Sequence, residues 1–176
     1  MKFENENAKR EFIDLLAERC AEAFIASRYP NQAFNFPFHG VPEELAYPII
    51  ELHIRIPAAG CLPESLKPPI GHMLSAEERS TVFRSCPAIE SIRLRSEFQR
   101  CGFLNALMRE LSRAGIPYVN LSNIANSELA LHYLNLSRIP GTGLELTSAP
   151  NTVNPTILGP TFSVNLRERY KICEIG

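Results

Sequence analysis

The sequence predicts a mixed α/β fold, organised as a single domain over residues 1–176. The length and the composition, with 45% hydrophobic and 21% charged residues, are those of one ordinary globular domain. Stretches with apolar residues at helical spacing follow stretches in which apolar and polar residues alternate, as in folds that interleave helices and strands. Between one such strand and the next helix there is only a tight turn around Gly102.

The N-terminal half contains two helical patterns. Apolar side chains recur at helical spacing from residue 8 to about residue 27, and Asn7 is a candidate N-cap for this helix. The spacing from Ser75 to Glu78 is that of a capping box, which begins a second helix. Between them the sequence predicts a loop or short edge strand over residues 31–45, a strand over 47–56, and a long irregular loop over 57–73 with four prolines and two glycines.

The C-terminal half alternates strands with helices. Ile92 and Leu94 lie on one face of the first of these strands, and Arg93 and Arg95 lie on the other. The pattern predicts, in order, a strand over residues 89–98, a helix over 103–113, a strand over 118–122, a helix over 126–136, and strands over 143–147 and 161–166.

Charge and cysteine content exclude several kinds of function. Lysine and arginine total 18 against 19 acidic residues, so the net charge of −1 gives no overall attraction to nucleic acid or to an anionic membrane. No apolar run reaches the roughly 20 residues that cross a bilayer, and the polar N-terminus lacks the apolar core of a secretory signal. The five cysteines and four histidines are scattered without metal-ligand spacing. We therefore expect a cytoplasmic protein with no metal site, no nucleic-acid partner and no membrane partner.

The turn at Gly102 has the features of an anion site. Where a strand passes directly into a helix, the first helical turn leaves several backbone N–H groups unpaired, and the helix dipole adds positive potential at the same point. Glycine lets a phosphate approach the backbone, and Gln99 and Arg100 can add side-chain donors. A plain tight turn would use the same glycine, so the turn alone leaves both interpretations open.

The residues around this turn resemble the acyl-CoA motif of the GNAT acyltransferase superfamily. In that motif a strand of alternating apolar residues leads to an acidic–aromatic pair and then to Gln/Arg-x-x-Gly-x-Gly/Ala at the start of a helix. Here Glu97-Phe98 matches the pair, Gln99 the first position and Gly102 the middle glycine, whereas Leu104 stands at the last small position. The resemblance implies that acetyl-CoA or another acyl-CoA binds as co-substrate at Leu94, Arg95, Gln99, Arg100, Cys101, Gly102, Phe103, Leu104, Asn105 and Asn126.

A second motif agrees with the first. In the superfamily the helix after the next strand commonly begins with Asn and carries Tyr seven residues later, as Asn126 and Tyr133 do here. The resemblance covers residues 89–166, the acyl-CoA-binding core, and implies a GNAT-like mixed, mostly antiparallel central sheet flanked by helices. Residues 1–88 would form the acceptor-side half, with the Pro-rich loop described above and the aromatic segment Phe34–Phe38 shaping the acceptor site.

Direct acyl transfer to an amine needs a base for the amine and a proton or hydrogen bond for the leaving thiolate. The resemblance implies that Tyr133 serves the thiolate, and a tyrosine packed in the core is the alternative. Glu90, near the start of the central strand, is a candidate base or else a solvated residue at a strand end. Glu51 and His53, on one face of the preceding strand, are an alternative base pair.

Two further interpretations concern residues beside the reacting groups. Asn120 and Ser122 lie on the strand that splays from its neighbour in the superfamily, where backbone donors could steady the oxyanion of the intermediate. Cys101 lies in the presumed phosphate turn without a nearby base, so we interpret it as a small loop residue and not as a nucleophile.

The function that the resemblance implies is N-acyl transfer, with acetyl as the expected group, from acyl-CoA to a small-molecule or peptide amine. Two alternatives stay open. The segment Ile89-Glu90-Ser91-Ile92-Arg93, after a Pro-rich loop and a helix, is similar to autoinducer and N-acyl amino acid synthases, which take acyl groups from acyl carrier protein. A non-catalytic binding domain of the same fold would account for Leu104 and for the missing Gly-Phe after the second motif. A homodimer is compatible with each of these functions.

Overall fold

The computed structural model describes residues 5–26, 50–122, 124, 126–148 and 159–170. The predicted loop at 31–45, with Phe34–Phe38, lies outside the described residues. The elements in chain order are α1 (Glu6–Ala26), β1 (Ile50–Arg55), the 3₁₀ helices η1 (Ala59–Cys61) and η2 (Glu64–Leu66), α2 (Ala76–Ser85), β2 (Ala88–Leu94), the 3₁₀ helix η3 (Ser96–Phe98), α3 (Phe103–Arg113), β3 (Tyr118–Leu121), α4 (Ser127–Ser137), β4 (Leu144–Ser148), β5 (Thr161–Asn165) and α5 (Leu166–Arg169).

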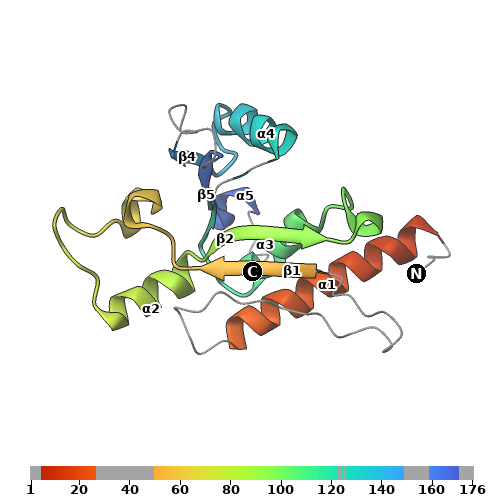
Figure 1. Ribbon diagram of the computed structural model, residues 1–176, viewed down its shortest axis with the longest axis horizontal. Coiled ribbons are helices and arrows are strands. Elements are labelled where there is room, and N and C mark those ends of the chain that lie inside the picture. Colours follow the sequence, from red (N-terminus) through yellow and green to blue (C-terminus); the bar gives the residue numbers. More distant parts are fainter. Residues whose placement is uncertain (1–4, 27–49, 123, 125, 149–158, 171–176) are drawn as a thin grey trace, which may run out of the picture.

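The strands form one five-stranded sheet in the order β1-β2-β3-β5-β4 (Figure 1). Every neighbouring pair is antiparallel except β2 and β3, which run parallel. A parallel pair needs a crossover connection, and α3 lies within it. The predicted mixed α/β architecture, with a mostly antiparallel sheet and flanking helices, is therefore confirmed for the described part of the chain.

The two parallel strands pair at only two positions and then part. Ala88 pairs with Asn120 and Ile89 with Leu121, after which β2 continues to Leu94 without a partner in β3. Figure 1 shows β1 and β2 together along the long axis of the molecule, while β5, β4 and α4 rise away from them. The sheet thus opens at the C-terminal ends of β2 and β3, and we call this feature the strand opening.

A β-bulge interrupts the register between β1 and β2. His53 pairs with Ser91, but the next residue of β1, Ile54, pairs with Ile89, so Glu90 has no counterpart in β1. Such an extra residue stands outside the ladder and bends its strand. The bulge therefore lies immediately after the last pair that joins β2 to β3.

The predicted strand over 89–98 is wrong at its C-terminal end. β2 ends at Leu94 and the chain turns into η3, which places Phe98 in the core with 1% of its surface exposed. The ring centroid of Phe98 lies 5.3 Å from that of Phe12 on α1. Burial of this ring against a distant helix requires the turn, and local alternation of apolar residues contains no sign of that contact.

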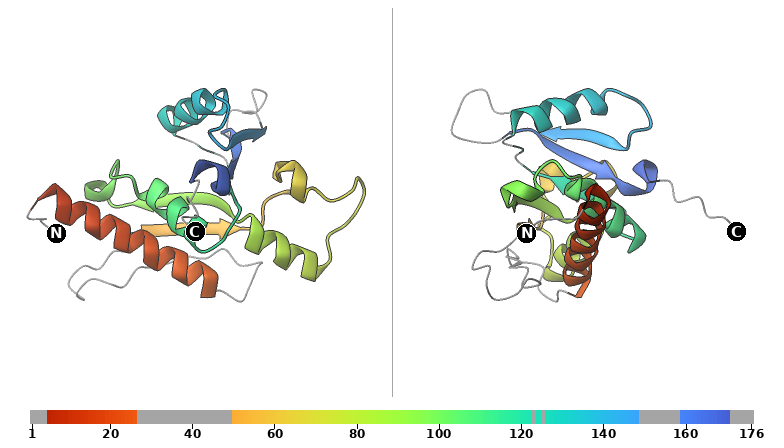
Figure 2. Two further views of the ribbon diagram at one scale, coloured as in Figure 1. Left: turned by 180° about the vertical axis from the view of Figure 1, so that it is seen from behind. Right: turned by 90° about the vertical axis from the view of Figure 1, so that its right-hand side faces the viewer.

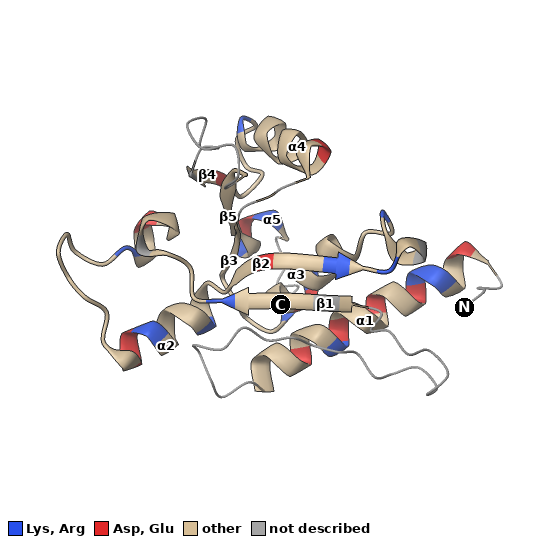
Figure 3. Ribbon diagram, in the orientation of Figure 1, with Lys and Arg blue, Asp and Glu red and all other residues tan. Residues whose placement is uncertain are grey.

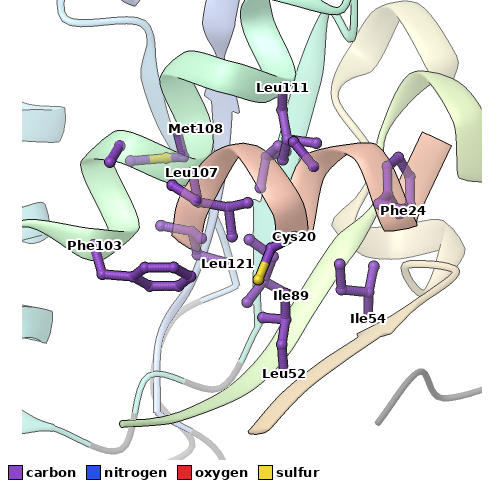
Figure 4. Packing of buried hydrophobic residues seen from close by; sticks show 14 of the residues in the cluster. Cys20, Phe24, Leu52, Ile54, Ile89, Phe103, Leu107, Met108, Leu111 and Leu121 are labelled. Atoms are coloured by element: carbon purple, nitrogen blue, oxygen red, sulfur yellow. The ribbon is translucent and has the colours of Figure 1, made fainter. Parts of the chain in front are cut away.

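α1 and α3 pack on one face of the sheet and share its main hydrophobic cluster (Figure 4). α3 forms over the predicted range of 103–113, with Leu107 and Leu111 fully buried, and Cys20 of α1 and Leu52 of β1 belong to the same cluster. Burial of one such leucine side chain stabilises the fold by about 1.5–3 kcal/mol. This layer therefore holds α3, and with it the turn at Gly102, firmly against the sheet.

The Pro-rich loop packs on the opposite face of the sheet. Leu62 is fully buried and packs with Val82 and Cys86 in a second, smaller cluster. The Nδ2 group of Asn120 on β3 donates a hydrogen bond to the carbonyl oxygen of Cys61 over 2.6 Å. The loop that the sequence predicts as irregular thus contains η1 and η2 and is attached to the sheet.

Side chains cap the N-termini of α1 and α2. The capping box predicted at Ser75 is confirmed, because Ser75 Oγ accepts from the Glu78 N–H over 3.2 Å and the Glu78 carboxylate accepts from the Ser75 N–H over 2.7 Å. The prediction of Asn7 as the cap of α1 is wrong. Asn5 Oδ1 accepts from the Ala8 N–H over 2.9 Å instead.

We expect Ser75→Ala to lower the free energy of unfolding by about 1 kcal/mol, the usual effect of losing an N-cap side chain. Ser80→Ala in the same helix is the control.

Hydrogen bonds from the Ser75 backbone and from His72 lower the pKa of Glu78 from 4.5 to about 2. The stabilisation by this carboxylate is therefore present above about pH 4.5 and is lost as the pH falls towards 2. Thermal unfolding of wild type and Glu78→Gln from neutral pH down to about pH 2 measures it. A difference in stability between wild type and Glu78→Gln that stays constant over this pH range would contradict the prediction.

Candidate functional site

The turn between η3 and α3 contains two residues in the left-handed backbone region. Arg100 has φ 59° and Gly102 has φ 81°, a conformation that glycine adopts without strain. Gln99 closes the turn by donating from Nε2 to the carbonyl oxygen of Leu94 over 3.0 Å. Gly102 is the N-cap residue of α3 and provides no side-chain hydrogen bond, so the first-turn amides of α3 have no side-chain cap.

This turn forms one end of an open groove of about 680 Å³ between α1 and α3, which we call the basic groove. Four cationic and two acidic residues of the described chain line it, so positive charge is in excess. Figure 3 shows basic segments near the start of α1 and at the tip of β2, at the same end of the molecule. The lining residues are Glu6, Asn7, Lys9, Arg10, Asp14, Gln99, Arg100, Cys101, Gly102, Asn105, Ala106 and Arg109.

Arg109 joins the two helices that form the walls of the basic groove. Its Nη2 lies 2.8 Å from Asp14 Oδ1 on α1, and its Nε lies 3.6 Å from Glu110 Oε1 on α3. The pair with Asp14 holds the middle of α3 against α1, whereas the pair with Glu110 lies within α3. Arg109 is therefore partly neutralised, and the less constrained cations Lys9 and Arg10 supply most of the attraction for an anion.

α3 and α4 both begin at the strand opening. Asn126 caps α4 by accepting from the Leu129 N–H over 2.9 Å. The exposed guanidinium of Arg100 lies 3.2 Å from the carboxylate of Glu128 in the first turn of α4. In the right-hand view of Figure 2, α4 lies over β4 and β5, at the other end of the sheet from α1. The two positive helix ends therefore flank the strand opening from its two sides.

Tyr133 is buried within α4, with 3% of its surface exposed. Its ring centroid lies 5.8 Å from that of Phe162 on β5 and 5.6 Å from that of His132. Burial raises the pKa of Tyr133 to about 12, so the hydroxyl stays protonated at neutral pH. Tyr133 does not line the basic groove. Tyr133 is therefore packed like a core tyrosine, and its protonated hydroxyl can still donate a hydrogen bond.

Glu90, the predicted base, lies half-buried at the bulge of β2. Its Oε1 lies 2.9 Å from Nη2 of Arg55 at the end of β1. His53, the alternative base, is half-buried two residues earlier on β1 and pairs in register with Ser91. The side chain of Glu51 lies outside what the structure describes. Glu90 and His53 thus lie on two neighbouring strands, and Glu90 directly follows the last residue of β2 that pairs with β3.

The oxyanion donors predicted on β3 are used elsewhere, which corrects that prediction. The N–H of Asn120 donates to the carbonyl oxygen of Pro87, and the N–H of Ser122 donates to that of Ile89, each over 2.9 Å. The Ser122 hydroxyl donates to Asn120 Oδ1 over 2.7 Å. These bonds hold the two parallel strands together, and the irregular backbone lies on β2, at Glu90.

The predicted donor-site residues fall into three sets. The set that lines the basic groove comprises Gln99, Arg100, Cys101, Gly102 and Asn105. Phe103 is 2% exposed and Leu104 packs against the main cluster, so these two residues offer only their backbone amides to the turn. Leu94, Arg95 and Asn126 do not line the basic groove.

The groove also contains residues that the sequence did not predict. Lys9 and Arg10 belong to α1, and their place beside α3 follows from long-range packing for which the sequence gives no signal. Cys101 donates from its thiol to the carbonyl oxygen of Gln99 over 3.2 Å. This contact matches the interpretation of Cys101 as a small loop residue.

Among the described residues, none of the helices is long and apolar enough to cross a membrane. No group of three or more His, Cys, Asp or Glu side chains in this part of the chain is arranged to hold a metal ion. No protein-family model, curated protein or solved structure matches the chain.

Proposed function

We propose that the chain is an N-acyltransferase of the GNAT type, which transfers an acyl group, acetyl in the simplest case, from acyl-CoA to an amine. The observation that carries this proposal is the strand opening with a helix N-terminus on each side. β2 and β3 part after Ile89 and Leu121, α3 follows Gly102, and α4 follows Asn126. This order of elements agrees with the resemblance of residues 89–166 to the superfamily.

In this proposal the phosphates of the donor bind at the start of α3. Backbone amides and the helix dipole attract a pyrophosphate there, as at other helix N-termini. Lys9, Arg10 and Arg100 line the same groove, and arginine suits bidentate contact with phosphate. The pantetheine arm would enter the strand opening along the part of β2 that has no partner in β3, and would bring the thioester to the bulge at Glu90.

The reaction is direct attack of the amine nitrogen on the thioester carbonyl carbon. The nitrogen–carbon bond forms, the oxyanion collapses, the carbon–sulfur bond breaks, and the departing thiolate takes a proton. Tyr133 is the proposed donor of that proton because of its place in the second motif, seven residues after Asn126, and its hydroxyl is protonated at neutral pH, as for any tyrosine whose pKa is not lowered. Glu90, beside Arg55, is the proposed acceptor of the proton that the attacking amine loses.

Each of the two alternatives has support of its own. A non-catalytic binding domain is favoured by the packing of Tyr133 on Phe162, because the residue does not line the basic groove. Acyl carrier protein as donor is compatible with the cations of the groove, because its phosphopantetheine arm also carries a phosphate. The adenosine half separates the two donors. A groove of about 680 Å³ has room for the phosphorylated adenosine that only free CoA carries.

We expect CoA and acetyl-CoA to raise the thermal midpoint, because a ligand that binds only the native state stabilises it by mass action. At about 100 times the dissociation constant the gain is about 2.7 kcal/mol, which corresponds to roughly 5–10 °C for a chain of this size. Dephospho-CoA and 4′-phosphopantetheine should give smaller shifts, since each lacks groups that the basic groove would hold. Equal shifts for CoA and 4′-phosphopantetheine would favour the carrier-protein donor instead.

Release of free thiol tests the chemistry. Acetyl-CoA and longer acyl-CoAs, and acyl carrier protein in a parallel series, would be mixed with a panel of amines, amino acids and peptides. The proposal predicts thiol release from acyl-CoA that depends on both the protein and an amine. Release from acyl carrier protein alone would support the carrier-protein alternative. CoA binding without release from any donor would support the non-catalytic domain.

A further inference from the structure

A second groove, of about 400 Å³, lies where the Pro-rich loop meets β3, β5 and β4, and we call it the acidic groove. It includes the face of β5 opposite the main hydrophobic cluster, since Phe162 and Val164 belong to that cluster while Ser163 lines the groove. None of the described residues that line it is Lys or Arg. Its polar side chains include Glu64, Ser65, Tyr118, Glu145, Ser163 and Glu168.

Ser163 is the most informative residue of this groove. It is 2% exposed, and its Oγ has no hydrogen-bond partner. Buried hydroxyl groups in native proteins nearly always have a partner, so each exception needs an explanation. Ser163 has a polar cross-strand neighbour on each side: Asn120 on β3, which is already bonded to Cys61 and Ser122, and Glu145 on β4, which also lines the groove. The Ser163 hydroxyl is therefore free to accept a hydrogen bond from a ligand in the groove.

The carboxylates of the acidic groove come from separate elements, with Glu64 on η2, Glu145 on β4 and Glu168 on α5. They do not form a cluster that could hold one metal ion. Glu64 pairs with Lys67 at 2.7 Å. The hydrogen bond and the charge of Glu64 raise the pKa of Lys67, and the charge of Glu145 adds to this effect. Beside this paired carboxylate, the groove presents the negative charges of Glu145 and Glu168 on two different elements, which match a ligand with separate cationic groups.

We propose that the acidic groove binds a linear aliphatic polyamine, with one ammonium group donating to Ser163 Oγ and the others beside Glu145 and Glu168. That such a polyamine is the acyl acceptor rests on the proposed function, whereas its binding does not. Ser163 pairs in register with Asn120, and Asn120 with Ala88 on β2. Two strand spacings, about 10 Å, therefore separate the floor of the groove from the strand that carries the bulge, which is within the length of an extended polyamine.

Calorimetric titration with spermidine at low ionic strength tests this proposal. Ser163→Ala should weaken binding about tenfold, because a hydrogen bond from a charged donor is lost. The double variant Glu145→Gln/Glu168→Gln should weaken it about fivefold, as expected for two partly exposed charge contacts. The matched control is Glu11→Gln/Glu18→Gln, which removes two exposed charges from α1 and should leave the affinity within about twofold of wild type.

Two results would overturn the assignment: no binding of spermidine to the wild type, or equal weakening by the control pair, which would indicate unspecific attraction. Ser163→Ala should not lower the thermal midpoint of the free protein, because the lost hydroxyl has no partner there. If that variant fails to fold, the carboxylate variants still decide. Specific binding of spermidine without thiol release from any donor would support the groove and contradict the proposed function. Thiol release with other amines, but no spermidine binding, would support the proposed function and contradict the assignment of the acidic groove.

Discussion

Tyr133→Phe is expected to lower kcat by about 10²–10⁴-fold with little change in donor affinity, if the Tyr133 hydroxyl protonates the departing thiolate. The ring stays, so its packing on Phe162 should survive and the loss should lie in the chemical step. Steady-state thiol release with the best amine of the panel measures kcat, and titration with CoA measures donor affinity. A decrease of about tenfold or less would make this role minor.

The pH profile provides a second readout for Tyr133. Because burial raises its pKa to about 12, loss of its proton cannot reduce kcat of the wild type between about pH 6 and about pH 9. A decline of kcat above pH 8 that disappears in Tyr133→Phe would contradict this assignment. If Tyr133→Phe keeps the wild-type kcat throughout this range, Tyr133 is structural and another group, such as water, serves the thiolate.

Gly102→Ala is expected to weaken CoA binding by about tenfold or more. The added methyl group would stand where a phosphate approaches the first-turn amides of α3. In the free protein, no described atom beyond the two flanking residues lies within 4 Å of the position that the new Cβ would take, so the change introduces no clash with the rest of the fold. The backbone at φ 81° still disfavours alanine, and we expect a stability cost of about 1–2 kcal/mol.

Gly115→Ala is a matched control at the other end of the same helix. Gly115 has φ 85° and the same free space around its Cβ position, so the substitution should cost similar stability. It should leave CoA affinity unchanged, because Gly115 lies at the C-terminal end of α3, away from the basic groove. If both variants weaken CoA binding equally, the effect is one of stability. If neither does, the turn at Gly102 does not hold the phosphates.

Sequence patterns predicted those features that depend on neighbouring residues. The helix over 103–113, the capping box at Ser75 and the start of a helix at Asn126 each depend on residues within four positions, and all three are present. The bulge at Glu90 also left a local signal. Ile89 and Ile92 are both apolar but three residues apart, which breaks the alternation of a regular strand. The prediction of one uninterrupted strand over this stretch is therefore wrong at Glu90, where the register shifts.

The features that the sequence did not predict depend on contacts between distant segments. Lys9 and Arg10 line the basic groove because α1 packs on α3, which α1's own apolar stripe does not specify. The end of β2 depends on burial of Phe98 against α1. The unpartnered hydroxyl of Ser163 depends on how Asn120 is already bonded. The periodicity of apolar residues along a short segment cannot predict contacts between segments that are far apart in the sequence.

Calorimetric titration of the wild-type protein with CoA at low ionic strength tests most directly whether the chain binds this donor at the start of α3, because it requires neither an acceptor nor turnover. We expect one CoA to bind per chain with a dissociation constant below about 100 μM, and the affinity to fall as salt screens the cations of the basic groove. We also expect about tenfold weaker binding by Gly102→Ala and unchanged binding by Gly115→Ala. No binding of CoA, acetyl-CoA or a longer acyl-CoA up to about 1 mM would contradict the proposed function.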